Sequence, residues 1–141
     1  MRKILILFFL TVLGCTTDEP RHLVVGDWRW VSSTGGIGGW TLKPKNNDER
    51  ILRLTADGKF EVYTNNVLFF SANYHLSNRK SSSDRAQELV LTVDNAVIHQ
   101  RDTVNYYPSF GDGRIGELSN TELELVEDFC NDCYGHSFVR K

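Results

Sequence analysis

Turn-forming residues interrupt the sequence every eight to twelve residues, and this spacing constrains the fold more than any other feature. The runs between these turns are rich in β-branched and aromatic residues, a combination typical of short strands joined by hairpins. Asp57-Gly58 is the strongest turn signal and predicts a hairpin between strands at 50–55 and 59–64. Asn65-Asn66 opens a second turn. From residue 15 onward no segment predicts a helix, so the sequence indicates an all-β protein.

We expect eight or nine strands in total. The other expected strands lie at 26–33, 67–76, 88–93, 97–107, 114–118, 122–126 and 134–140. Polar or glycine-rich loops are expected at 34–39, 43–48, 77–85 and 108–113. Within the first strand, strict alternation puts Trp28, Trp30 and Ser32 on one face. The same alternation puts Arg29, Val31 and Ser33 on the other face.

The connections are short enough for hairpins, which favours an up-and-down order of antiparallel strands. Closure of such a sheet removes its exposed edges, so we expect an antiparallel up-and-down β-barrel of about eight strands. The same strands could also form a β-sandwich, because strand periodicity does not distinguish the two architectures.

The N-terminus has the pattern of a secretory signal. Arg2 and Lys3 precede an apolar run over residues 4–13, which is too short to span a bilayer as a permanent helix. The run ends in Gly14-Cys15, which resembles the lipobox of bacterial lipoproteins. The resemblance implies that residues 1–14 form a cleaved signal-peptide helix and that Cys15 carries the lipid. The alternative is an ordinary signal peptide with a chance cysteine at its cleavage site.

The polar segment that follows predicts a tether, and we divide the mature chain into the lipidated N-terminus and tether at 15–22 and a barrel domain at 23–141. Seven extended residues reach only about 25 Å, so we expect the domain to lie close to the membrane. We expect an outer-membrane lipoprotein, on the periplasmic face or the cell surface. Asp18-Glu19 resembles a surface-export signal of some Gram-negative lipoproteins, and a solvated linker is the alternative.

Size and charge restrict the partners. Removal of fourteen residues from 141 leaves 127, which suits one domain. Loss of Arg2 and Lys3 leaves 14 basic against 18 acidic residues, a formal charge of −4. No basic face is implied, so the composition argues against a nucleic-acid partner and against charge-driven adhesion to anionic membrane.

Several segments together resemble small bacterial lipocalin-like lipoproteins. They are residues 25–33 with the glycine-rich loop behind them, the hairpin at Asp57-Gly58, residues 118–125 and residues 137–140. The resemblance implies a lipocalin-like barrel. It also implies that Gly26, Trp28 and Arg140 close one end, with the basic side chain packed over the indole. The chain departs from the family pattern in lacking a clear helix after the last strand, so the resemblance supports the fold more than a transport role.

Cys130-Asn131-Asp132-Cys133 is the sharpest local motif. With Cys15 lipidated, the other two cysteines form a pair in an oxidising compartment, which favours a disulfide across a hairpin tip. A redox motif is disfavoured because no helix follows. A metal site that adds His136 and Asp132 lacks the usual second ligand pair, and unpaired thiols complete the alternatives. We therefore expect no metal and no cofactor.

No catalytic motif is evident, because the four histidines are scattered and none accompanies a recognisable nucleophile, so we expect a binding protein and not an enzyme. The numerous aromatic residues predict either a packed core or an apolar pocket with Trp40 and Phe110 at its rim. The favoured hypothesis is a membrane-anchored barrel that binds a small apolar ligand or an envelope protein. The alternative is a protein-interaction or inhibitor barrel without a small-molecule ligand.

Overall fold

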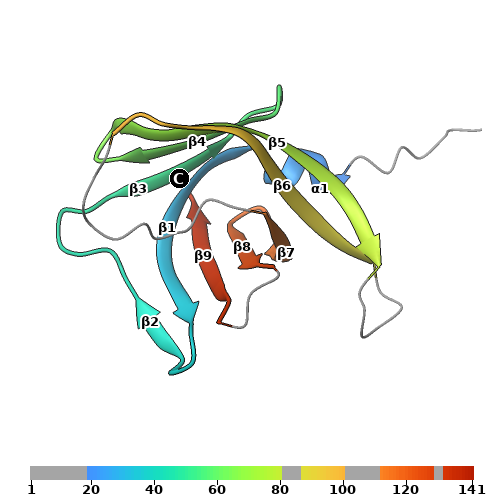
Figure 1. Ribbon diagram of the computed structural model, residues 1–141. Coiled ribbons are helices and arrows are strands. Elements are labelled where there is room, and N and C mark those ends of the chain that lie inside the picture. The colour runs from blue at the N-terminus through green and yellow to red at the C-terminus, as the bar shows by residue number, and fades with distance from the viewer. Residues whose placement is uncertain (1–18, 81–86, 101–111, 129–131) are drawn as a thin grey trace, which may run out of the picture.

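The computed structural model describes residues 19–80, 87–100, 112–128 and 132–141. In this part of the chain one short helix precedes nine strands (Figure 1). The elements are α1 (Glu19–Val24), β1 (Gly26–Gly35), β2 (Trp40–Leu42), β3 (Arg50–Leu54), β4 (Lys59–Thr64), β5 (Val67–Lys80), β6 (Gln87–Ile98), β7 (Gly113–Leu118), β8 (Glu122–Glu127) and β9 (Tyr134–Arg140). None of the described residues belongs to a helix long and apolar enough to cross a membrane.

Eight of the strands form a closed antiparallel barrel. Sheet order runs from β1 through β3, β4, β5, β6, β7 and β8 to β9, and pairing of β1 with β9 closes the ring. The short strand β2 is additional and pairs only with the end of β1. The expected all-β, up-and-down barrel is confirmed, and the eight-stranded ring fits a lipocalin-like fold.

Two hairpins follow the predicted turn chemistry. Gly58 has a φ of 81°, and its N–H donates to the carbonyl of Thr55 at 3.1 Å, which closes the turn between β3 and β4. Asn65 and Asn66 have φ values of 50° and 64°, and they turn β4 into β5. A two-residue turn with positive φ at both positions matches the right-handed twist of the flanking strands.

β1 contains a bulge that the sequence-based alternation did not include. Trp30 pairs with Phe138 and Ser32 pairs with Ser137, so Val31 is an extra residue with no partner on β9. Because a bulge shifts every later side chain to the other face, Ser33 joins the two tryptophans inside the barrel and is fully buried. Val31 lies outside and is 40% exposed. The prediction that Ser32 shares the inner face with Trp28 and Trp30 is therefore wrong.

The segment expected to be part of a tether contains a helix. α1 covers residues 19–24 and joins the barrel, so residues 19–22 are not a linker. Pro20 lies in the first turn of α1, where its missing N–H costs no helical hydrogen bond. The rest of the expected tether and the expected signal peptide, including Cys15, lie outside the described residues.

Three strand boundaries also differ from expectation. β5 continues to Lys80 and β6 runs unbroken from Gln87 to Ile98, although a loop was expected from residue 77 and a separate strand from residue 97. The long β5–β6 ladder forms through backbone groups, so polar side chains do not end it. β1 likewise extends to Gly35, where a Cβ atom would approach the carbonyl oxygen of Cys133 to 2.2 Å and only glycine fits.

The barrel interior in this part of the chain is filled by apolar side chains. The core includes Trp28, Trp30, Leu52, Leu54, Phe60, Val62, Phe69, Phe70, Ala72, Tyr74, Leu91, Leu123 and Phe138, none more than 8% exposed. Phe60 and Phe70 pack edge to face, with ring centroids 6.0 Å apart. A water-filled hollow beside these side chains would expose them, so the described core is packed.

Candidate functional site

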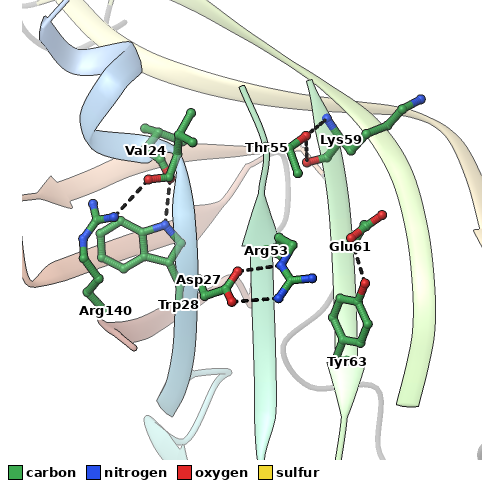
Figure 2. Close-up of polar contacts among 10 residues, drawn as sticks. Val24, Asp27, Trp28, Arg53, Thr55, Lys59, Glu61, Tyr63 and Arg140 are labelled. Atoms are coloured by element: carbon green, nitrogen blue, oxygen red, sulfur yellow. Dashed lines mark hydrogen bonds and ion pairs between the residues drawn. The ribbon is translucent and has the colours of Figure 1, made fainter. Parts of the chain in front are cut away.

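The N-terminal end of the barrel is sealed around Trp28. The indole is fully buried, and its Nε1–H donates to the carbonyl of Val24, the last residue of α1, at 2.7 Å. The Arg140 guanidinium lies over the same ring, with its central carbon 4.1 Å from the ring centroid (Figure 2). The first and last strands of the barrel thus meet at one aromatic side chain.

Arg140 also holds the end of α1 through hydrogen bonds. Its Nη2 donates to the carbonyl of Leu23 at 2.5 Å and its Nη1 to the carbonyl of Val25 at 2.9 Å. Its Nε donates to the carbonyl of Asn120 at 2.7 Å, in the turn before β8. Carbonyls at the end of a helix have no partner within it, and a cation there also complements the helix dipole.

Gly26 is the residue that allows this arrangement. Its φ is 150°, and a Cβ atom at this position would lie 2.3 Å from Nη1 of Arg140. Any larger residue would displace the guanidinium from the indole. Gly26, Trp28 and Arg140 therefore lie together, at the closed end where the resemblance to lipocalin-like proteins places them.

A ladder of polar side chains crosses the outer face beside this seal. Arg53 donates two hydrogen bonds to Asp27, at 2.7 and 2.8 Å, and its guanidinium lies 5.0 Å from the ring centroid of Tyr63 (Figure 2). The hydrogen bond from Arg53 lowers the pKa of Asp27, and burial raises the pKa of Tyr63, whose hydroxyl donates to Glu61. The Asp27 and Arg53 side chains are more than one-third exposed, so solvent screens this ion pair and it adds little to the stability of the barrel.

A chain of polar side chains lies inside the barrel next to Trp30. The indole Nε1–H of Trp30 donates to Ser33 Oγ at 2.9 Å, and Ser33 Oγ lies 2.7 Å from Nδ1 of His136. His136 Nε2 lies 3.2 Å from Oε1 of Glu127, whose second oxygen accepts the backbone N–H of Tyr134 at 3.1 Å. These side chains join β1, β9 and β8.

One arrangement of protons satisfies every member of this polar chain. The Ser33 hydroxyl accepts from Trp30 and donates to Nδ1 of a neutral His136, which donates through Nε2–H to Glu127. Burial lowers the pKa of His136, and the nearby Glu127 carboxylate opposes this shift in part. Neutral His136 is the form that fits, because a protonated ring would direct an N–H at Nδ1 toward a serine that already donates there.

The order serine, histidine, carboxylate is also that of a nucleophile with its base and orienting acid. Ser33 has no accessible surface and His136 is 2% exposed, so no substrate carbonyl can approach the hydroxyl in this structure. In this structure the polar chain therefore connects neighbouring strands through buried hydrogen bonds.

The remaining residues predicted for a site are not brought together. Trp40 is 69% exposed at the start of β2 and lies over Gly38, while Phe110 is outside the described residues. Cys133 is disulfide-bonded, but Cys130 lies outside the described residues, so their pairing stays a prediction. His136 contacts Ser33 and Glu127, and the described ranges contain no group of three metal-ligating side chains that could hold an ion.

No protein-family model, curated protein or solved structure matches this chain. The polar chain could not be predicted from the sequence, because its members are far apart: Ser33 and His136 are separated by 103 positions. A bulge in β1 would have been the necessary signal, and no local residue pattern marks it.

We predict that Arg140→Met lowers the free energy of unfolding by about 2–4 kcal/mol, because the variant leaves the carbonyls of Leu23 and Val25 without these donors and removes the contact with Trp28. Arg140→Lys keeps the positive charge but not the planar guanidinium, so it should lower the free energy of unfolding less than Arg140→Met does. Urea denaturation measures both values. Arg29→Met, an exposed change on β1, is the control, and an equal loss in this control would contradict the assigned role.

We predict that the barrel loses stability as the pH falls below about 6.5, the ordinary pKa of histidine. Burial lowers the pKa of folded His136, so the unfolded chain takes up the proton first and acid favours unfolding. Thermal melts between pH 7.5 and 5.0 should show a falling midpoint. The Asp27 carboxylate titrates in a separate range, below its ordinary value of 3.8.

The variant His136→Gln can accept from Ser33 and donate to Glu127 without titrating, so its midpoint should depend less on pH. The matched control is His22→Gln at an exposed position of α1, which should keep the wild-type pH dependence. A wild-type slope that survives in His136→Gln would assign the effect to another group.

Proposed function

We propose that this chain is a membrane-anchored, lipocalin-like binding lipoprotein of the bacterial cell envelope. The observation that carries the proposal is a closed barrel whose N-terminal end is sealed by α1, Trp28 and Arg140. In sequence, α1 begins four residues after the predicted lipid-bearing Cys15. The basic start and apolar run before Gly14-Cys15 support export and lipidation.

The spacing supports one orientation at the membrane. Only residues 16–18 separate Cys15 from α1, and three extended residues reach about 10 Å. The sealed end of the barrel then faces the bilayer. β1 runs away from α1 and carries the β1–β2 hairpin at its far end, so this hairpin points away from the membrane (Figure 1).

We propose that the protein binds an envelope protein through the β1–β2 hairpin. Ile37 is 92% exposed and Trp40 is 69% exposed at this tip, and tryptophan is enriched among the residues that dominate protein interfaces. The packed state of the described core favours this mode over a small apolar ligand inside the barrel. The enclosed ligand is the second candidate, which the eight-stranded lipocalin-like fold supports.

We also propose that the protein is not an enzyme. Ser33 is the serine of the buried polar chain, and its complete burial supports a structural role. The contact from Trp30 to its hydroxyl supports the same role.

Lipidation predicts that radiolabelled palmitate is incorporated into the wild-type chain in bacteria and is lost in Cys15→Ser. The variant should also keep its signal peptide and migrate as the larger precursor. Cys130→Ser is the matched control and should label like the wild type. Labelling that persists in Cys15→Ser would contradict the anchor.

The hairpin predicts that Ile37→Ser combined with Trp40→Ala abolishes a cross-link from the anchored chain to a single envelope protein in intact cells. Val67→Ser, which removes an exposed apolar side chain from the start of β5, should leave the cross-link unchanged. Native mass spectrometry of the same preparations tests the second candidate. A bound small molecule that is retained in the double variant, without any cross-link, would favour the enclosed ligand.

A further inference from the structure

Along one of its edges β1 pairs first with β3 and then with β2, and a groove lies between these two pairings. Residues 26–29 pair with β3, whereas residues 33–35 pair with β2. Between them, Trp30–Ser32 have no strand partner on this edge in the described pairings. The chain between β2 and β3 passes this interval and forms with β1 a groove of about 410 Å³. That volume lies within the range of small-molecule sites.

The groove carries unbalanced positive charge. Its two carboxylates are paired, since Asp48 contacts Arg50 at 3.3 Å and Glu49 contacts Lys141 at 3.2 Å. Its two cations, Arg29 and Lys45, have no ion-pair partner within the described ranges. The overall formal charge of the chain is negative, so this excess of positive charge is a local feature of the groove.

The same groove has an apolar wall. Val31 lies on the outer face of β1 and is 40% exposed, and Pro44 lines the groove beside it. An apolar wall beside two unpaired cations is complementary to a molecule that carries a negative group on an apolar body. Arginine and lysine both bind carboxylates through charge-assisted hydrogen bonds.

We propose that this groove binds a small amphipathic carboxylate, with the carboxylate at Arg29 and Lys45 and the apolar body against Val31 and Pro44. The site lies outside the barrel and is separate from its interior. It goes beyond the proposed function, because it requires neither the lipid at Cys15 nor a protein partner at the β1–β2 hairpin.

Calorimetric titration of naphthoate into the full chain in phosphatidylcholine nanodiscs tests the proposal, with empty nanodiscs as the blank. Naphthoate should bind saturably, and naphthylmethanol, its neutral counterpart, should bind about tenfold more weakly or not at all. Absence of saturable naphthoate binding, or equal binding of the alcohol, would overturn the proposal.

Two variants locate the binding. Arg29→Gln with Lys45→Gln should weaken naphthoate binding by about tenfold or more, and Val31→Asp should abolish it by placing a negative charge on the apolar wall. Lys43→Gln is the matched control: it removes the same charge from the same loop at a position outside the groove, and it should change affinity by less than about twofold. Equal losses in the control, or none in the variants, would place the ligand elsewhere.

A second lipid separates a soluble ligand from a membrane headgroup. In nanodiscs of anionic phosphatidylglycerol, naphthoate should bind as it does in phosphatidylcholine. Loss of naphthoate binding in phosphatidylglycerol alone would assign the groove to anionic lipid and overturn the small-ligand proposal. All variants change exposed side chains, and unchanged thermal midpoints confirm that they remain folded.

Discussion

The contact between Trp28 and Arg140 is the one on which the rest of the barrel depends. Trp28 lies near the start of β1 and Arg140 at the end of β9, so their stack reinforces the pairing that closes the sheet. The same two side chains bind carbonyl groups at the end of α1, which covers this end of the barrel. The guanidinium lies over the face of the indole, where a cation is attracted by the ring quadrupole, and it is partly buried there. One pair of residues therefore connects closure of the ring to closure of its end.

The bulge at Val31 is the second constraint, and it determines which of the later side chains of β1 point into the barrel. Inside the barrel, the bulge brings Ser33 between Trp30 and His136, so the buried indole and imidazole both form a hydrogen bond with the serine hydroxyl. Buried polar groups are costly when unpaired, and this polar chain leaves none of its donors unpaired. Because only neutral His136 fits this arrangement, protonation of the ring would destabilise the folded barrel.

Local chemistry explains which parts of the fold could be predicted from sequence. Asp57-Gly58 and Asn65-Asn66 set their hairpins by backbone conformations that other residues disfavour, so these turns are visible in the sequence. α1 could not be predicted because a helix of six residues has little intrinsic stability, and the carbonyls of its last two residues accept from Arg140 and Trp28. The full length of β5 and β6 was missed because pairing between backbones carried strands through residues with polar side chains.

Some residues of the candidate sites could also be predicted from the sequence, and others could not. Gly26, Trp28 and Arg140 could be named from family resemblance, since a glycine-x-tryptophan start is compact in sequence. Ser33, His136 and Glu127 could not, because their contacts depend on a one-residue shift in β1. Without that shift Ser33 would point outward and His136 would lack its serine partner, whereas Val31 would stay on the outer face with Arg29. The interior polar chain therefore depends on one inserted residue. A substitution that removed the bulge would turn Ser33 away from His136 and leave the wall of the outer groove in place.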